Sequence, residues 1–239
     1  MSYAICDPPL VEARLLRRYK RFLADVETAD GETVTIHCPN SGAMLGVAPP
    51  GAAVAMAPAQ GGGKLPFRLS LVHADACWIG VDTGWPNRLA EAAIRAGDLP
   101  AFDGYETIRR EVRYGRRNSR IDLLLQGHGR PDCYVEVKNV HLRRTGDLAE
   151  FPDSVTARGA KHLAELADMA RDGARAAMLF VVQRPDCRQL GLAADIDPDY
   201  AAAFAAAREA GVEAHAFAVR WTPAGVDFAH HVALRVQAD

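Results

Sequence analysis

Three charged residues, Asp122, Glu136 and Lys138, interrupt two short apolar segments of the chain. Residues 119–125 read SRIDLLL, and residues 133–140 read CYVEVKNV. Charged side chains in apolar strands are costly to bury unless they pair with each other or bind a cation. Carboxylates are the ligands that Mg²⁺ prefers. The residue types therefore predict a metal site in which one amine lies beside two carboxylates.

Both segments alternate apolar and polar residues, which is typical of β-strands whose side chains point to opposite faces. We expect Ile121, Leu123 and Leu125 to share one face of the first strand. In the second strand, Glu136 and Lys138 should stand together on one face.

The connection between the two strands, residues 126–132, contains two glycines and a proline and favours a hairpin turn. A hairpin would bring Asp122 opposite Glu136 or Lys138. A salt-bridged, solvent-exposed hairpin face would have the same pattern, so these residues alone leave a structural role open.

The spacing resembles the bipartite acidic motif of the PD-(D/E)xK metal-dependent nucleases, because thirteen residues separate Asp122 from the Glu-Val-Lys segment. In this reading Asp122 and Glu136 bind Mg²⁺ or Mn²⁺, and the carbonyl of Val137 is a third ligand. Lys138 would orient or help deprotonate the attacking water. Asp122, Glu136 and Lys138 are therefore the predicted catalytic residues.

Basic residues cluster although the formal net charge is only −2. One group immediately precedes the Asp122 strand, one lies near the N-terminus, and one shares a face of a predicted helix. Basic groups beside an acidic metal site suit phosphodiesters, whereas an ordinary solvated face is the alternative. The predicted nucleic-acid-binding residues are Arg113, Arg116, Arg117, Arg120, Arg158, Lys161, Arg18 and Lys20.

Composition indicates a folded, soluble protein: the chain has 239 residues, and 49% of them are hydrophobic. No run of eighteen uncharged apolar residues occurs, and the N-terminus has no apolar signal core. The five cysteines lack the spacing of a zinc site or a secreted disulfide framework. These features predict a cytoplasmic protein that does not bind membranes.

The order of the elements predicts two domains. Turn signals separate five strands over 14–27, 32–38, 51–57, 67–72 and 77–81, which is consistent with a small β-barrel. After a hinge at 85–87, helices are expected over 88–96, from a cap at Asp153 or Ser154 to about 172, and over 198–211, among further strands. We expect a mixed α/β chain with an OB-like β-barrel over 1–84 and a nuclease-like domain over 85–239.

Five blocks of sequence in this order resemble the sugar fermentation stimulation protein A (SfsA) family. They are RYKRFLADV (18–26), HCPNSGAM (37–44), SRID (119–122), PDCYVEVK (131–138), and FPD (151–153) followed by RGAKHL (158–163). The resemblance implies an N-terminal OB-like domain and a C-terminal restriction-endonuclease-like α/β domain. It also implies a DNA-binding protein associated with regulation of sugar (maltose) metabolism.

Together these observations predict a non-specific DNA-binding protein with a Mg²⁺-dependent phosphodiesterase site, an endonuclease of the PD-(D/E)xK type. The alternative is a DNA-binding regulatory protein without catalysis. The sequence leaves open whether the partner is DNA or RNA, single- or double-stranded, and whether a homodimer is needed to cut both strands.

Overall fold

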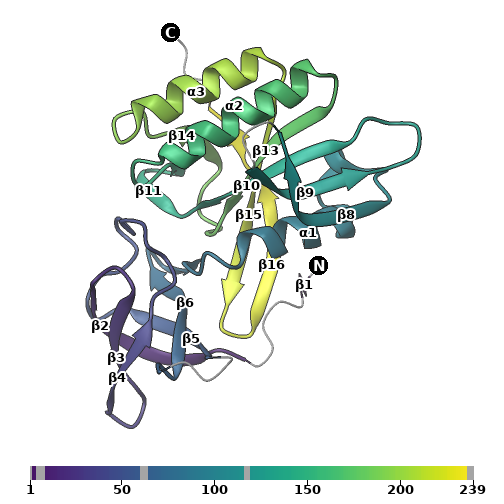
Figure 1. Cartoon of the computed structure of the whole chain (residues 1–239). Helices are drawn as coiled ribbons and strands as arrows, with labels where there is room; N and C mark the ends of the chain where they lie inside the picture. Colours follow the sequence, from purple (N-terminus) through teal and green to yellow (C-terminus); the bar gives the residue numbers. More distant parts are fainter. Residues whose placement is uncertain (1, 4–8, 60–63, 116–118, 236–239) are drawn as a thin grey trace.

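The computed structural model describes residues 2–3, 9–59, 64–115 and 119–235. Figure 1 shows a small body of strands, formed by the first part of the chain, below a larger body in which helices cover a sheet. The predicted fold class, a mixed α/β chain with an N-terminal OB domain, is confirmed.

Five strands close the N-terminal barrel. They are β2 (Val11–Tyr19), β3 (Leu23–Glu27), β4 (Thr33–His37), β5 (Ala53–Pro58) and β6 (Phe67–Ala74). Strand β2 pairs with β3 and β5, β3 pairs with β4, and β5 pairs with β6. A parallel bridge between His37 and Arg68 joins β4 to β6 and completes the ring. Closure leaves little exposed strand edge, and apolar side chains fill the interior.

Two strand predictions in the barrel were wrong. The segment 14–27 is not one strand, because the chain turns back at Lys20 and Arg21, which both have positive φ values (49° and 62°). Strand β7 (Cys77–Gly80) does not belong to the ring. It pairs with β6 on one side and with β15 of the larger body on the other. The two bodies thus share one hydrogen-bonded sheet, and the boundary expected at 84/85 stays a prediction.

The sheet of the larger body has the order β15-β13-β10-β9-β8. Its strands are β8 (Thr107–Tyr114), β9 (Ser119–Gln126), β10 (Cys133–Val140), β13 (Arg175–Val182) and β15 (Glu213–Thr222). Strands β10, β13 and β15 are parallel, whereas β8 and β9 run antiparallel. As expected for a central strand, β13 is almost entirely buried. At the other edge, β16 (Gly225–His231) pairs with β15, and β1 (Ser2–Tyr3) pairs with β16.

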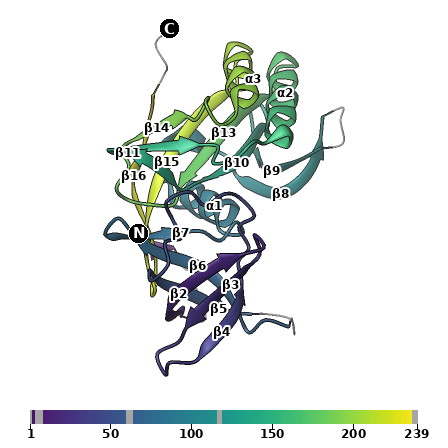
Figure 2. The same cartoon turned by 90° about the vertical axis from the view of Figure 1, so that its left-hand side faces the viewer.

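Helices cover both faces of this sheet (Figures 1 and 2). Helix α1 (Pro86–Ala96) packs on one face, and α2 (Ala157–Arg171) and α3 (Pro198–Glu209) pack on the other. A short 3₁₀ helix, η1 (Pro100–Phe102), follows α1. The predicted start of α1 was two residues late, because proline is well suited to the first helical turn. Thr156, not Asp153 or Ser154, caps α2.

A second, smaller sheet was not predicted. It has the order β11-β12-β14-β17, formed by Leu142–Thr145, Leu148–Phe151, Gln189–Leu192 and Ala233–Leu234. These strands have two to four residues each, which is too short for a clear periodicity. Within the described part of the chain, no helix is long and apolar enough to cross a membrane.

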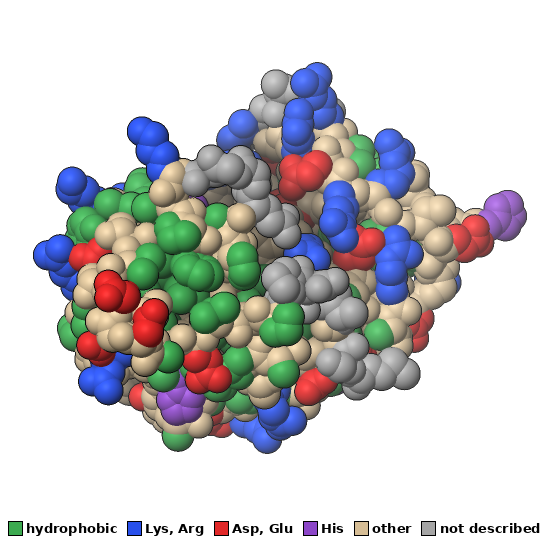
Figure 3. All heavy atoms as spheres, turned by 90° about the horizontal axis from the view of Figure 1, so that it is seen from below, with side chains coloured by type: hydrophobic (Ala, Val, Ile, Leu, Met, Phe, Trp, Pro, Cys, Tyr) green, Lys and Arg blue, Asp and Glu red, His purple; other side chains and the backbone are tan. Residues whose placement is uncertain are grey.

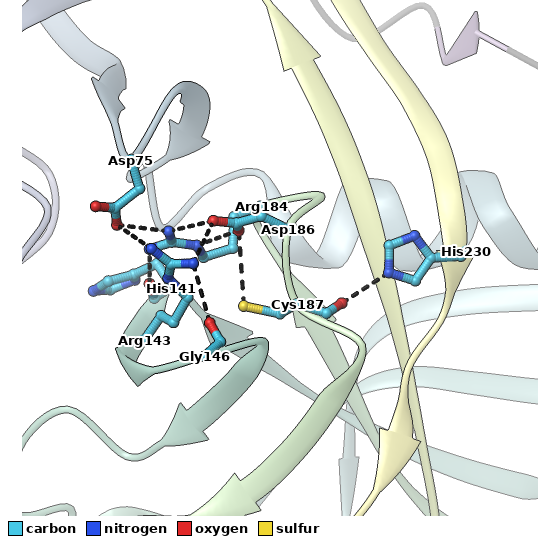
Figure 4. Close-up of polar contacts among 8 residues, drawn as sticks. All are labelled: Asp75, His141, Arg143, Gly146, Arg184, Asp186, Cys187 and His230. Carbon is cyan, nitrogen blue, oxygen red and sulfur yellow. Dashed lines mark hydrogen bonds and ion pairs between the residues drawn. The ribbon is translucent and has the colours of Figure 1, made fainter.

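A network of ion pairs around the buried Arg184 links the barrel to the larger body (Figure 4). Arg184, only 1% exposed, donates to both carboxylate oxygens of Asp186 at 2.6 and 2.7 Å. It also donates to Asp75, in the β6–β7 turn of the barrel, at 2.8 Å. Arg143 pairs with both Asp75 and Asp186 at 3.2 Å. Two guanidinium groups therefore face two carboxylates across the junction.

Candidate metal and nucleic-acid site

Asp122 lies where strands β9 and β10 separate. Their pairing runs from Leu125 opposite Cys133 to Leu123 opposite Val135 and ends there. Beyond this point the backbone N–H of Val137 donates to Asp122 Oδ2 at 2.7 Å. The carboxylate thus replaces a ladder acceptor, as a buried N–H requires.

The faces of β9 alternate differently from the prediction. Leu123 and Leu125 pack on the α1 side of the sheet, but Ile121 packs on the α2 side together with Leu124. The predicted common face of Ile121, Leu123 and Leu125 was therefore wrong. The change of face falls at Asp122, which is also where pairing with β10 stops. Periodicity in sequence assumes a regular ladder, and this ladder is irregular at the site.

Helix α1 also holds Asp122. Asn87, in the first turn of α1, donates from Nδ2 to Asp122 Oδ1 at 2.8 Å. Residues 85–87 were predicted to be a hinge, so Asn87 was missed as a site residue. Its signal in the sequence was weak, because a polar residue after Trp-Pro is equally typical of a loop.

Glu136 is 2% exposed and has two partners on one oxygen. Lys138 Nζ donates to Oε1 at 2.6 Å, and His162 Nδ1 contacts the same atom. Burial alone would raise the pKa of Glu136, but the Lys138 ammonium and His162 hold it below its usual value. Within the described residues, the second oxygen, Oε2, is buried without a hydrogen-bond partner. An ionised carboxylate with one unsatisfied buried oxygen is expected to bind a cation.

The two carboxylates influence each other. Burial, followed by the charge of Glu136, raises the pKa of Asp122 to about 6. The Val137 N–H, Lys138 and Asn87 oppose this shift. A divalent cation between the carboxylates would remove the repulsion and satisfy Oε2, so the residues fit the predicted metal.

The ligand set would be small. The described residues contain no group of three or more His, Cys, Asp or Glu side chains arranged to bind a metal. Two carboxylates and the Val137 carbonyl are nevertheless compatible with Mg²⁺, which usually keeps several waters and takes one or two protein carboxylates.

His162 connects the acidic site to α2. It is 6% exposed, and its Nε2 receives a hydrogen bond from Arg158 Nε at 3.3 Å. Because Nε2 accepts, the ring proton is assigned to Nδ1, which donates to Glu136. The sequence placed Arg158 and His162 on one helix face, but the contact with Glu136 was missed. The only sign of this contact in the sequence was the spacing of Arg158 and His162, which are four residues apart on one helix.

Two tyrosines form the wall behind Glu136. Within the described residues, the hydroxyls of Tyr114 and Tyr200 are buried without hydrogen-bond partners. Burial, followed by the charge of Glu136, raises the pKa of both phenols. The site is therefore shielded from water on this side, which strengthens electrostatic interactions within it.

Arg113 and Arg120 face each other across strands β8 and β9. Both are exposed, and neither side chain makes a hydrogen bond or ion pair within the described parts of the chain. Like charges directly opposite in a ladder are destabilising, so an anionic partner would relieve this pair. Figure 3 shows Lys and Arg side chains interspersed with Asp and Glu on the right of the view, and on the left a hydrophobic patch with charged side chains at its edge. The predicted residues Arg116 and Arg117 lie outside the described residues.

The other predicted nucleic-acid-binding residues differ in how exposed their side chains are. Arg18 is engaged inside the barrel, where its Nη2 donates to the carbonyls of Asn40 and Gly42 at 2.8 and 2.9 Å. Lys20 is exposed at the β2–β3 turn, and Lys161 is exposed on α2. Their contacts with nucleic acid stay predictions.

Sequence profiles match both parts of the chain. Residues 16–81 match the profile described as the SfsA N-terminal OB domain. Residues 84–225 match the profile described as the sugar fermentation stimulation protein RE domain.

Curated relatives match over most of their length. A sugar fermentation stimulation protein homolog from Rhodospirillum centenum is 55% identical, over 91% of this chain and 94% of that one. A homolog from Jannaschia sp. is 54% identical, over 91% of each chain.

One solved structure matches almost the whole chain. SfsA from Pyrococcus furiosus, solved in complex with Ca²⁺, aligns with a TM-score of 0.87 and 27% identity, over 99% of this chain and 98% of that one. A repair endonuclease from Pyrococcus abyssi aligns with a TM-score of only 0.29 and 12% identity, so no inference is based on it.

Proposed function

Because this chain belongs to the sugar fermentation stimulation protein family, we propose that it binds DNA without sequence preference and hydrolyses phosphodiesters with a divalent cation. The observation that supports this proposal most directly is the pair Asp122 and Glu136. The pKa of Asp122 is raised to about 6, and Glu136 Oε2 is buried without a partner among the described residues. A site built only for stability would pair these charges.

The cation would be Mg²⁺ or Mn²⁺, held by Asp122, Glu136 and the Val137 carbonyl. When bound, it would stabilise the negative charge that develops on the scissile phosphate. The solved relative from Pyrococcus furiosus is in complex with Ca²⁺. Ca²⁺ and Mg²⁺ both take oxygen ligands, so this relative supports a divalent cation here.

The protein's own residues would prepare the reaction. Lys138 Nζ, 2.6 Å from Glu136 and 14% exposed, would orient the attacking water and offset charge in the transition state. His162, through Nδ1, would keep the Glu136 carboxylate in one orientation. Tyr114 and Tyr200 would limit access of bulk water.

Arginines around the site would hold the phosphate backbone. Arg120 lies in the Asp122 strand, and Arg113 lies opposite it in β8. Arg116 and Arg117, outside the described residues, lie between them in the sequence. Arg158 and Lys161 would approach from α2, and Lys20 and Arg18 from the barrel. Such contacts recognise charge and not base sequence, so binding should be salt-sensitive.

A second candidate is a DNA-binding regulator of sugar (maltose) metabolism without catalysis. The ion pair between Lys138 and Glu136 favours it, because an amine already paired with a carboxylate can serve structure alone. Both candidates use the same cationic surface.

A cleavage assay separates the two candidates. Labelled single-stranded, duplex and branched DNA, and matched RNA, would be incubated with Mg²⁺, Mn²⁺ or chelator. We expect cation-dependent cleavage that Glu136→Ala abolishes. Lys138→Ala should reduce cleavage by roughly 10²-fold or more and leave DNA affinity nearly unchanged. Binding without cleavage on every substrate would support the regulator instead.

A further inference from the structure

A cavity of about 570 Å³ lies between the barrel and the start of α1. Its barrel wall is formed by the end of β4 and by residues on both sides of the β5–β6 connection, including His37, Lys64 and Arg68. Its other wall is the segment from Asp82 to Arg88, which leads into α1. The cavity is thus located where the barrel ring closes through His37 and Arg68.

The lining is cationic. Lys64, Arg68 and Arg88 line it, against the single carboxylate of Asp82. That carboxylate is 4% exposed and already binds Arg68 Nη2 and, at 2.7 Å, the Gly84 N–H. Lys64 therefore contributes positive charge that no lining carboxylate balances, and this favours an anionic ligand.

The walls between these charges are apolar and aromatic. Phe67 is half-buried in the lining, next to Leu65 and Pro58. The Arg88 guanidinium lies over the Trp85 ring, 5.2 Å from its centroid, which restricts its position. A cationic groove with an accessible aromatic face is the combination that proteins use for unpaired nucleic-acid strands, whose bases stack while their phosphates are neutralised.

The cavity and the acidic site contact neighbouring residues of α1. Arg88 lines the cavity, whereas the preceding residue, Asn87, donates to Asp122 at 2.8 Å. A polymer in the cavity would therefore continue past the first turn of α1 toward Asp122 and Glu136. A small anion would fill only the cavity and would not extend to the acidic site.

The cavity is too small to enclose a double helix. A sphere of this volume is about 10 Å across, whereas the major groove of B-DNA alone is about 12 Å wide. We propose that this cavity binds one unpaired nucleic-acid strand, so that the substrate class is single-stranded DNA or RNA, or a junction between single and double strands. This inference rests on the proposed function, because it places the strand at that site.

The test measures binding without turnover. Anisotropy of a labelled oligo(dT) and of a labelled blunt hairpin duplex would be followed in chelator at several salt concentrations. The variant Lys64→Glu with Arg88→Glu should lose at least about tenfold in affinity for oligo(dT). Its slope of log K against log salt should become shallower by about 1.4, or about 0.7 per lost phosphate contact. Affinity for the duplex should change much less.

The matched control is Arg188→Glu, which reverses the charge of an exposed arginine just before β14, outside the cavity lining. It should leave the affinity for oligo(dT) nearly unchanged. Phe67→Leu keeps an apolar side chain but removes the stacking face, and we expect a loss of about fivefold or more for oligo(dT). Melting followed by circular dichroism would confirm that each variant is folded.

Two results would overturn the inference: unchanged binding of oligo(dT) by the folded double variant, or an equal loss for duplex and single strand. These results are independent of cleavage. Failure of the proposed function would appear as intact strand binding without cation-dependent hydrolysis by the wild-type protein.

Discussion

Two charge clusters in this molecule differ in how their charges are paired. In the junction cluster, Arg184 and Arg143 face Asp75 and Asp186, so charges are equal in number and paired. In the acidic site, Asp122 and Glu136 share one amine. The first cluster is arranged for stability, whereas the second retains unfavourable electrostatics within the protein.

The pKa values of Asp186 and Asp122, one carboxylate from each cluster, shift in opposite directions. The pKa of Asp186 is lowered, because the Arg184 guanidinium outweighs the burial that would raise it. The pKa of Asp122 is raised by burial and by Glu136. Unfavourable electrostatics retained in a fold are typical of functional sites. Variants of the junction cluster should therefore lower the stability of the protein. Variants of the acidic site should instead change the pH dependence of stability and the binding of cations.

The largest effect on stability should come from Arg184→Ala. Removing this buried guanidinium leaves Asp75 and Asp186 with less compensation, and we expect a loss of about 3–5 kcal/mol in the free energy of unfolding. The control is Arg144→Ala. Arg144 also pairs with two carboxylates, Glu150 and Asp195, but is 37% exposed, so it should cost about 1 kcal/mol or less. Equal losses in urea denaturation would contradict the distinction.

Asp122→Asn should stabilise the protein, whereas Arg184→Ala should destabilise it. A carboxyl whose folded pKa is raised to about 6 contributes stability that is present below pH 4 and lost as pH rises through 6. Without added cation, the variant should become more stable than the wild type by up to about 3 kcal/mol between pH 4 and pH 7. Saturating Ca²⁺ should reduce this advantage. Asp168→Asn, at an exposed carboxylate on α2, should show no such trend in thermal melts.

Replacing His162 should weaken cation binding without removing a ligand. His162→Ala frees Glu136 to rotate, and we expect a 10- to 100-fold loss in Mn²⁺ affinity by calorimetry. His162→Gln, which keeps a donor, should recover part of it. The matched control is His215→Ala, because His215 also contacts a glutamate, Glu213, at 2.9 Å. The assigned role would be contradicted if both alanine variants bound Mn²⁺ like the wild type.

The smallest effect on stability should come from the facing pair Arg113 and Arg120. Changing both to Gln removes a cross-strand repulsion and should stabilise the fold by about 0.2–1 kcal/mol. The same change should make the salt dependence of duplex binding shallower by about 1.8, or about 0.9 per lost contact. Arg171→Gln, at an arginine paired with Asp168, is the control for charge. An unchanged slope would remove the Arg113–Arg120 pair from the interface.

The sequence alone identified the family and the order of most strands and helices, and it predicted Asp122, Glu136 and Lys138 as site residues. These features are local, because a strand, a turn and a short motif depend on neighbouring residues. The hairpin followed from the turn-forming residues 126–132, and the common face of Glu136 and Lys138 followed from alternation; the structure contains the hairpin and brings the two side chains into contact.

Tertiary structure decided what local patterns do not encode. Asn87 and His162 reach the acidic site from helices 35 and 26 residues away in sequence from their partners. Strand β7 joins the barrel to the larger body, and the change of face at Asp122 follows from the end of pairing with β10. The cavity beside α1 likewise has walls from both bodies. The residue types determined which chemistry is available, and long-range packing determined which groups lie together to perform it.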